Sequence, residues 1–150
     1  KNQAFGFPSD DDLMLNYSNF DMEANEQELR QLIVNEKLMQ AVDNEDPLET
    51  EKLLDAGADV NYFDAEFHFC SPIHLAATHE EPILLRLLMS RGARVHALDA
   101  RNSTALHDAA SLGNTEIMVE LVSQFGADVN AVDSDERTPM HICAGRGFIE

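Results

Sequence analysis

Six histidines and two cysteines are the side chains of this 150-residue chain that could hold a metal ion or serve as a nucleophile or base. Zinc sites draw ligands from close pairs such as Cys-x-x-Cys or His-x-x-x-His, and neither pair occurs. Cys70 and Cys143 are far apart, whereas His74, His107 and His141 are spaced by 33 and 34 residues. One histidine at each step of a regular period is typical of a structural residue in a repeated unit.

The motifs of common enzyme classes are also missing from the sequence. There is no GxxxxGK[ST] phosphate-binding loop, no GxGxxG and no Gly-x-Ser-x-Gly elbow. Acidic residues are numerous, but the pattern places them in turns, helix caps and solvated helix faces, and no pair stands out for acid–base chemistry. We therefore expect no catalytic residues, no cofactor and no metal, and we predict that the chain is not an enzyme.

The charge of the chain narrows the class of partner. There are 28 acidic and 10 basic side chains, which give a formal net charge of −18. This charge disfavours direct binding to nucleic acid or to an anionic membrane surface, because both are negative. No apolar run approaches the roughly 18–20 residues that a membrane-spanning helix needs, so we expect no membrane insertion. The low cysteine content favours an intracellular location, in the cytoplasm or nucleus.

Two short motifs recur along the chain and define the elements that carry these residues. GADVN stands at 57–61 and 126–130, with GARVH at 92–96 between them, and the spacings are 35 and 34. Each is followed by a second motif, SPIH at 71–74, TALH at 104–107 and TPMH at 138–141. Three copies of two linked motifs at one period indicate an internal repeat.

The residues around the second motif predict a helix in each repeat. Ser71, Thr104 and Thr138 stand where a hydroxyl can cap a helix. Pro72 and Pro139 follow at the first helical position, where the missing N–H costs nothing. Glycines at 113 and 147 end these inner helices, and Glu80 replaces the glycine in the second repeat. The apolar spacing that follows predicts outer helices at 81–90 and 115–124.

The period and the two motifs resemble the ankyrin repeat, a unit of roughly 33 residues with a T-P-L-H-x-A signature. The resemblance covers about residues 36–150 and implies an all-α solenoid of helix pairs joined by β-turn fingers. We divide the chain into a flexible acidic arm at 1–25, an N-terminal capping repeat at 26–62, repeats at 63–98 and 99–132, and a partial repeat at 133–150. The capping repeat should begin with a helix at about 26–42. Because the last repeat lacks its outer helix, we expect the chain to belong to a longer array.

The resemblance also implies where a partner would bind. Ankyrin arrays bind other proteins through the finger tips and the exposed side of the inner helices, which line a concave groove. The family's variable positions, with the neighbouring Phe67 and His68, fall on a defined set of residues here. The set is Phe63, Ala65, Glu66, Phe67, His68, Thr78, His79, Leu98, Ala100, Arg101, Ser103, Ser111, Leu112, Val132, Ser134, Asp135, Arg137, Gly145 and Arg146.

The finger of the second repeat departs from the other two. It runs ten positions from Asn61 to Ser71, whereas the later fingers run eight, and it carries Phe63, Phe67 and Phe69. One interpretation is that Phe63 or Phe67 is exposed and anchors a partner, and the alternative buries them between repeats. Aromatic anchors beside acidic residues would suit a basic or amphipathic segment of another protein. Phe67→Ala should then weaken binding and leave thermal stability almost unchanged.

Three further hypotheses concern an effector segment and sites of modification. The arm interleaves acidic and apolar residues in PSDDDLMLNYSNFDM, a pattern similar to acidic activation segments, and it could equally be a solubilising or autoinhibitory tail. Ser9, with Asp12 three residues later, fits a phosphorylation site. By the resemblance, Asn61 and Asn130, which close the two GADVN motifs, are candidates for hydroxylation.

Together these features predict a non-catalytic protein-interaction module or adaptor that binds a partner through its fingers and groove. Two alternatives stay open. The first is a transcriptional regulator of the inhibitor-of-NF-κB type with an acidic effector arm. The second is a regulatory or targeting subunit of an enzyme.

Overall fold

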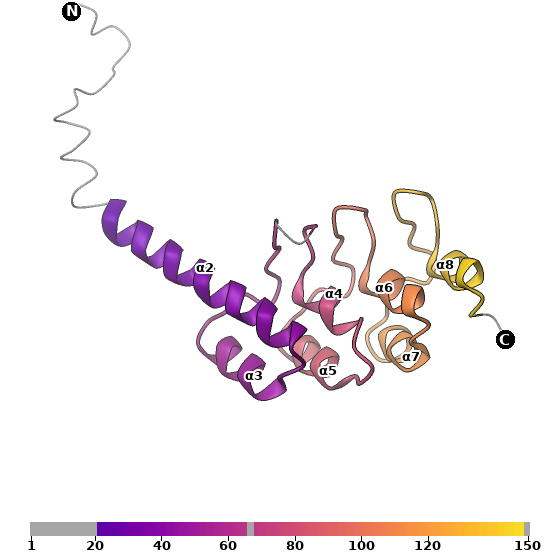
Figure 1. Cartoon of the computed structure of the whole chain (residues 1–150), viewed down its shortest axis with the longest axis horizontal. Coiled ribbons are helices and arrows are strands. Elements are labelled where there is room, and N and C mark those ends of the chain that lie inside the picture. Colours follow the sequence, from indigo (N-terminus) through magenta and orange to yellow (C-terminus); the bar gives the residue numbers. More distant parts are fainter. Residues whose placement is uncertain (1–20, 66–67, 149–150) are drawn as a thin grey trace, which may run out of the picture. The chain divides into compact units, whose positions relative to one another are not determined.

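The computed structural model describes residues 21–65 and 68–148 of the chain (Figure 1). The chain divides into two compact units, Lys1–Ile33 and a repeat unit, Val34–Glu150. Within the described residues all regular structure is helical, apart from one isolated bridge between Asp64 and Cys70, so the all-α prediction is confirmed. The helices are α2 (Asp21–Asp43), α3 (Pro47–Asp55), α4 (Pro72–Ala76), α5 (Ile83–Ser90), α6 (Ala105–Leu112), α7 (Thr115–Ser123) and α8 (Pro139–Arg146).

Helix α2 begins earlier than the sequence pattern indicated. The pattern predicted a helix from about residue 26, whereas α2 starts at Asp21, inside the segment that we assigned to the arm. Met22, Glu23 and Ala24 are good helix formers, so the helix extends through them although they contribute no apolar period. Ser9 and the other arm residues up to residue 20 lie outside the described residues.

The inner helices α4, α6 and α8 begin at the predicted cap residues, and the same hydrogen bond recurs at all three caps. Ser71, Thr104 and Thr138 adopt the extended backbone of a cap residue. In each case the histidine three residues later turns its Nδ1 back to the cap. The backbone N–H of the cap residue donates to it at 3.2, 3.1 and 3.1 Å. The threefold recurrence of the cap explains why hydroxyl and imidazole recur together in the sequence.

The inner helices end differently according to whether a glycine follows. Gly113 closes α6 with a φ of 68° and Gly147 closes α8 with a φ of 77°, left-handed values that glycine adopts without strain. Both helices have eight residues. In the second repeat Glu80 stands at this position, and α4 stops after five residues at Ala76. The departure that we noted in the sequence therefore shortens an inner helix.

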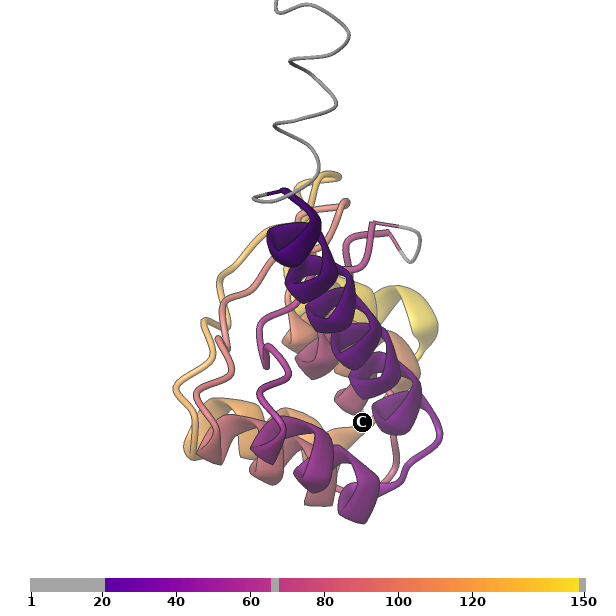
Figure 2. The ribbon, with the colours of Figure 1, turned by 90° about the vertical axis from the view of Figure 1, so that its left-hand side faces the viewer.

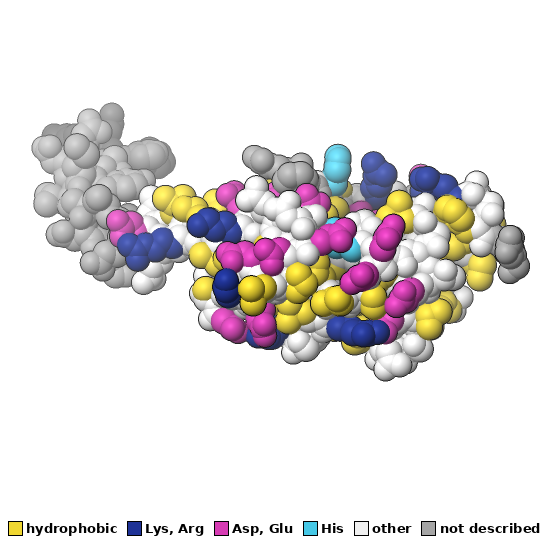
Figure 3. Space-filling model, turned by 60° about the horizontal axis from the view of Figure 1, so that its bottom comes forward, with side chains coloured by type: hydrophobic (Ala, Val, Ile, Leu, Met, Phe, Trp, Pro, Cys, Tyr) yellow, Lys and Arg dark blue, Asp and Glu magenta, His cyan; other side chains and the backbone are white. Residues whose placement is uncertain are grey.

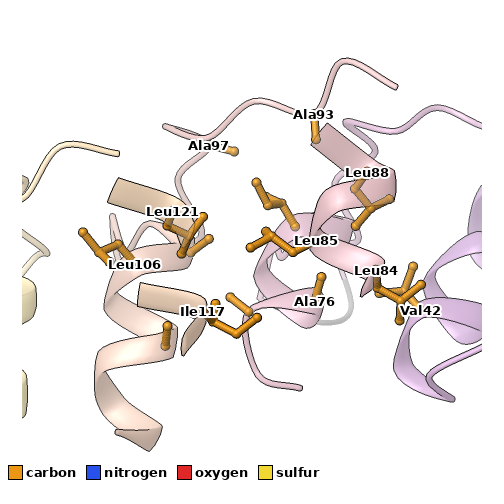
Figure 4. Close-up of a cluster of buried hydrophobic side chains, with 14 of the residues drawn as sticks. Val42, Ala76, Leu84, Leu85, Leu88, Ala93, Ala97, Leu106, Ile117 and Leu121 are labelled. Atoms are coloured by element: carbon orange, nitrogen blue, oxygen red, sulfur yellow. The ribbon is translucent and has the colours of Figure 1, made fainter. Parts of the chain in front are cut away.

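The repeat unit has two layers of helices. Figure 2 shows the outer helices α3, α5 and α7 side by side in one layer, and the inner helices form the other. Small residues such as Ala76 and Ala109 are completely buried and let adjacent inner helices approach closely. Figure 4 shows the larger core residues between the layers, among them Leu85, Ile117 and Leu121, all completely buried. The core is thus continuous from one repeat to the next.

The fingers are closed by one backbone hydrogen bond at equivalent positions. The N–H of Asp99 donates to Ser103 at 3.0 Å, and the N–H of Asp133 donates to Arg137 at 3.0 Å. In the second finger the N–H of Asp64 donates to Cys70 at 3.1 Å, so this finger closes two residues later, as predicted. Neighbouring fingers are joined as well, because Ala100 donates to the carbonyl of His68 at 2.9 Å.

Candidate functional site

The evenly spaced histidines hold the repeats together. The Nε2–H of His74 donates to the carbonyl of Ser103 at 3.0 Å, and that of His107 donates to the carbonyl of Arg137 at 3.0 Å. Each therefore joins an inner helix to the next finger. Burial lowers the pKa of His74, which keeps the ring neutral, with Nδ1 free to accept from the cap. Among the residues that the structure describes, no three His, Cys, Asp or Glu side chains gather to hold a metal ion.

The structure corrects the prediction for two residues of the predicted binding set, because it buries both. His79 is 8% exposed, and its Nε2–H donates to the carbonyl of Val42 at 2.7 Å. Because α4 ends early, the chain after it turns inward and carries His79 against the end of α2. Ser103 is also 8% exposed, since its carbonyl accepts from His74. Both side chains are largely buried, and a repeat-wide pattern of variable positions could not show this.

Three exposed apolar residues recur at one position of successive fingers and are called the finger ladder here. It consists of Phe63, Leu98 and Val132, which are 42%, 48% and 52% exposed. Each residue directly precedes the aspartate that opens its finger, so the three occupy equivalent positions in successive repeats. An apolar cavity of about 620 Å³ lies beside Phe63 and Leu98 and is walled by residues 94–97. All three ladder residues were in the predicted binding set.

A second cavity, called the polar hollow here, lies between the last two repeats. Its volume is about 330 Å³. It brings together six residues of the predicted set, including the buried Ser103, from two fingers and two inner helices. The lining consists of Arg101, Ser103, His107, Asp108, Ser111, Asp133, Arg137, His141, Ile142, Gly145 and Arg146.

Asp108 lines the polar hollow but was not among the residues predicted from the sequence. It occupies the position that holds Leu75 and Ile142 in the neighbouring repeats, and this exchange of an aliphatic residue for an acid was the available signal. Burial, together with the charge of Asp99, raises the pKa of Asp108 to about 7, although Arg101 opposes the shift. The carboxyl is therefore divided between its charged and neutral forms near neutral pH.

A third cavity, called the acidic hollow here, lies at the other end of the repeat unit and has a volume of about 390 Å³. Its acidic lining comes from Glu36 and Asp43 of α2 and from Asp64 of the second finger, and Leu75 adds an apolar wall. Lys37, Met39 and Gln40 complete it. The α2 residues were not among the predicted binding residues, because that set was located from the T-P-L-H signature and the capping repeat lacks it.

The remaining predicted residues are spread over the exposed surface. Thr78 and Leu112 line one shallow cavity at the ends of the inner helices. Ala65, His68, Ala100, Ser134 and Asp135 are exposed on the fingers. Phe69, which was not in the set, is 51% exposed on the second finger. Glu66 and Phe67 lie outside the described residues, so the prediction for Phe67 stays untested.

The charge is distributed over the repeat unit. On the face shown in Figure 3, acidic side chains lie across the unit with apolar side chains between them. Among the helices of the described residues, none is long and apolar enough to cross a membrane.

Comparison with known proteins identifies the family. A family model described as ankyrin repeats (3 copies) matches residues 38–133 and 73–150. The chain belongs to the ankyrin-repeat family. Ankyrin repeats are generally protein–protein interaction modules and are typically non-catalytic. The chain is also similar to protein fem-1 homolog C of Xenopus laevis, with 43% identity over 53 residues. That match covers 35% of this chain and only 8% of the relative, so the chain spans a small part of it.

Proposed function

We propose that this ankyrin-repeat chain is a non-catalytic module that binds a segment of another protein along the finger ladder and the adjoining groove. The observation that carries the proposal is the ladder itself. Phe63, Leu98 and Val132 expose 42–52% of their surface at equivalent positions of three successive repeats. Exposed apolar residues scattered singly need no explanation, but a regular row beside an apolar cavity is typical of a binding surface.

The acidic hollow supports the second part of the proposal, that the segment is basic or amphipathic. Glu36, Asp43 and Asp64 place three carboxylates around a cavity that also contains Leu75, and Lys37 is the one cation among the described residues that line it. A lysine or arginine of the partner can lay its aliphatic stem against such a wall and its charge among the carboxylates. Charge complementarity of this kind sets the orientation of a partner and its association rate more than its final affinity.

The proposal is tested with peptides selected from a random display library against the whole 150-residue chain. Their affinities are then measured for Leu98→Ser/Val132→Ser and for a control, Val119→Ser. Val119 is a matched control because it is 61% exposed but lies on the outer helix α7. We expect the ladder variant to weaken binding at least about tenfold and the control to stay within about twofold. Equal affinity for the ladder variant and the wild type would contradict the proposal.

The basic character of the segment has its own test. The variant Glu36→Gln/Asp43→Asn removes two charges from the acidic hollow, and Glu81→Gln/Glu116→Gln removes two exposed charges elsewhere. We expect only the first variant to reduce both the association rate and its dependence on salt. If both variants act alike, the hollow does not contact a basic side chain.

An intracellular location, in the cytoplasm or nucleus, accompanies the proposal. Both cysteines are free thiols, Cys70 half-buried and Cys143 buried, which supports a reducing environment. Fractionation of cells that produce the tagged chain tests this location. The transcriptional alternative rests on the arm, and a reporter assay on residues 1–25 tests it directly.

A further inference from the structure

The arginines of the repeat unit fall into two groups. Arg86, Arg91 and Arg137 are paired with carboxylates. Arg86 forms a forked ion pair with Glu120, and Arg91 pairs with Asp55 at 2.6 Å. Arg94, Arg101 and Arg146 make no ion pair with any residue that the structure describes. Two of these three, Arg101 and Arg146, line the polar hollow.

The carboxylates of the hollow do not balance these two charges. Asp133 is already bound by Arg137 at 2.9 Å, and Arg137 reaches Asp135 at 3.0 Å as well. The other acid of the lining is Asp108, whose pKa of about 7 leaves it partly uncharged at neutral pH. Arg101 and Arg146 therefore bring into the hollow two guanidinium groups that form no ion pair with a described residue, although the whole chain has a net charge of −18.

We propose that the polar hollow binds an acidic side chain, Asp or Glu, of the partner segment through the guanidinium groups of Arg101 and Arg146. The inference rests on the proposed function, because the acidic residue belongs to the segment that lies on the finger ladder. A guanidinium and a carboxylate form short, directional and frequently bidentate hydrogen bonds. Their attraction is greater in a recess than on an open surface, because less water screens the charges.

Asp108 makes this binding depend on pH. The groups that influence its pKa are Asp99 and Arg101 on the third finger, and Asp108 in turn raises the pKa of Cys70 on the second. The cavity of Asp108 is shared by His107 of α6, by Asp133 and Arg137 of the fourth finger, and by His141 and Arg146 of α8. A charged Asp108 repels an incoming carboxylate and competes for the guanidinium groups. A neutral Asp108 can donate a hydrogen bond to that carboxylate. The acidic side chain should accordingly bind more tightly as the pH falls from about 8 to about 6.

The test uses short peptides and NMR on the whole isotope-labelled chain. The probes are Ac-Leu-Glu-Leu-NH2, its Gln counterpart and its Lys counterpart. The variants are Arg101→Gln/Arg146→Gln and, as control, Arg86→Gln, which removes an exposed guanidinium from the outer helix α5, away from the hollow and the finger ladder. We expect the Glu peptide to shift the side-chain Nε–Hε signals of Arg101 and Arg146 and to bind about tenfold more tightly than the Gln peptide. The double variant should lose this preference, and Arg86→Gln should keep it within about twofold.

Several results would overturn the inference. The first are equal binding of the Glu and Gln peptides, tighter binding of the Lys peptide, and an equal loss in Arg86→Gln and in the double variant. A phosphoserine tripeptide that binds far more tightly than the Glu peptide would exclude a carboxylate as the ligand. In Asp108→Asn, the affinity for the Glu peptide should no longer change between pH 8 and 6, and an unchanged pH dependence would also contradict the proposal.

These outcomes are separate from those of the proposed function. Display-selected peptides that depend on Leu98 and Val132 but not on Arg101 and Arg146 would leave the proposed function intact and refute this inference. A Glu peptide that occupies the hollow, with no selected peptide dependent on the ladder, would refute the proposed function alone.

Discussion

The imidazole of His79 donates a hydrogen bond to the carbonyl of Val42 at 2.7 Å and ties the second repeat to the last turn of α2. The other ring nitrogen of His79 lies 3.0 Å from the carboxylate of Glu45. This contact spans 37 residues of sequence and closes the loop that follows the shortened α4. It shows that a position that is variable in the family has a structural role in this chain.

His79→Ala should therefore reduce stability rather than partner binding. The substitution leaves the Val42 carbonyl without its donor and opens a gap beside α2, and we expect a loss of about 2–3 kcal/mol in the free energy of unfolding. Urea unfolding followed by circular dichroism measures it. Glu45→Gln is the control, because the Glu45 side chain is 62% exposed and its loss should cost less than about 1 kcal/mol. If His79→Ala unfolds like the wild type, the contact is not stabilising.

His107 and His141 form a natural pair for measuring the bond between repeats. Both cap their own helix, but only His107 is buried and bonded to the next finger, and His141 is exposed. We expect His107→Ala to cost about 2–4 kcal/mol and His141→Ala less than about 1 kcal/mol. Equal losses would assign the stabilisation to the cap alone.

Asp108 should make the stability of the chain fall as the pH rises. Its pKa is raised from 3.8 to about 7 in the folded chain, so between these values the folded state holds a proton that the unfolded state has lost. The folded carboxyl is thus unfavourable above about pH 7 and has little effect below about pH 4. Asp108→Asn should be more stable than the wild type by about 2 kcal/mol at pH 8, and the difference should disappear near pH 4.

Thermal unfolding of both proteins across this pH range measures the difference. Glu81→Gln, an exposed position with the same change of charge, should show no such trend. A constant difference between Asp108→Asn and the wild type at all pH values would mean that the Asp108 carboxyl does not titrate in this range.

Asn61 and Asn130 close equivalent motifs but have different surroundings. The Asn61 amide donates to Gly92 at 3.1 Å and accepts from the N–H of Arg94 at 2.9 Å, which joins two repeats. The Asn130 side chain is exposed. Asn61→Ala should cost about 1–2 kcal/mol and Asn130→Ala less than about 0.5 kcal/mol, as urea unfolding would show.

The same difference bears on the hydroxylation hypothesis. A hydroxylase must extract the Asn61 side chain from two hydrogen bonds, whereas Asn130 is accessible in the folded chain. We expect incubation with an asparaginyl hydroxylase to add the mass of one oxygen to the Asn130 peptide before the Asn61 peptide. Modification of Asn61 first would show that access is not the controlling factor.

Local signals in the sequence were sufficient for the repeat, the helix caps and the length of the second finger. A hydroxyl before Pro72 or Pro139 and a glycine at 113 act within one turn of backbone, so their effect is readable without knowledge of the fold. The finger ladder was readable too, because Phe63, Leu98 and Val132 recur at one position of the repeat. The start of α2 could not be read from the sequence, because the residues there favour a helix by propensity but show no apolar period.

The tertiary structure alone decided which of the predicted binding residues are accessible and which charges are compensated. His79 and Ser103 carry polar side chains typical of a surface, yet contacts from 37 and 29 residues away bury them. Arg137 and Arg101 look alike in the sequence, but the first is bound by Asp133 and the second is not. Burial and electrostatic pairing depend on neighbours that only the stacking of repeats brings together, so a pattern with a period of one repeat cannot determine them.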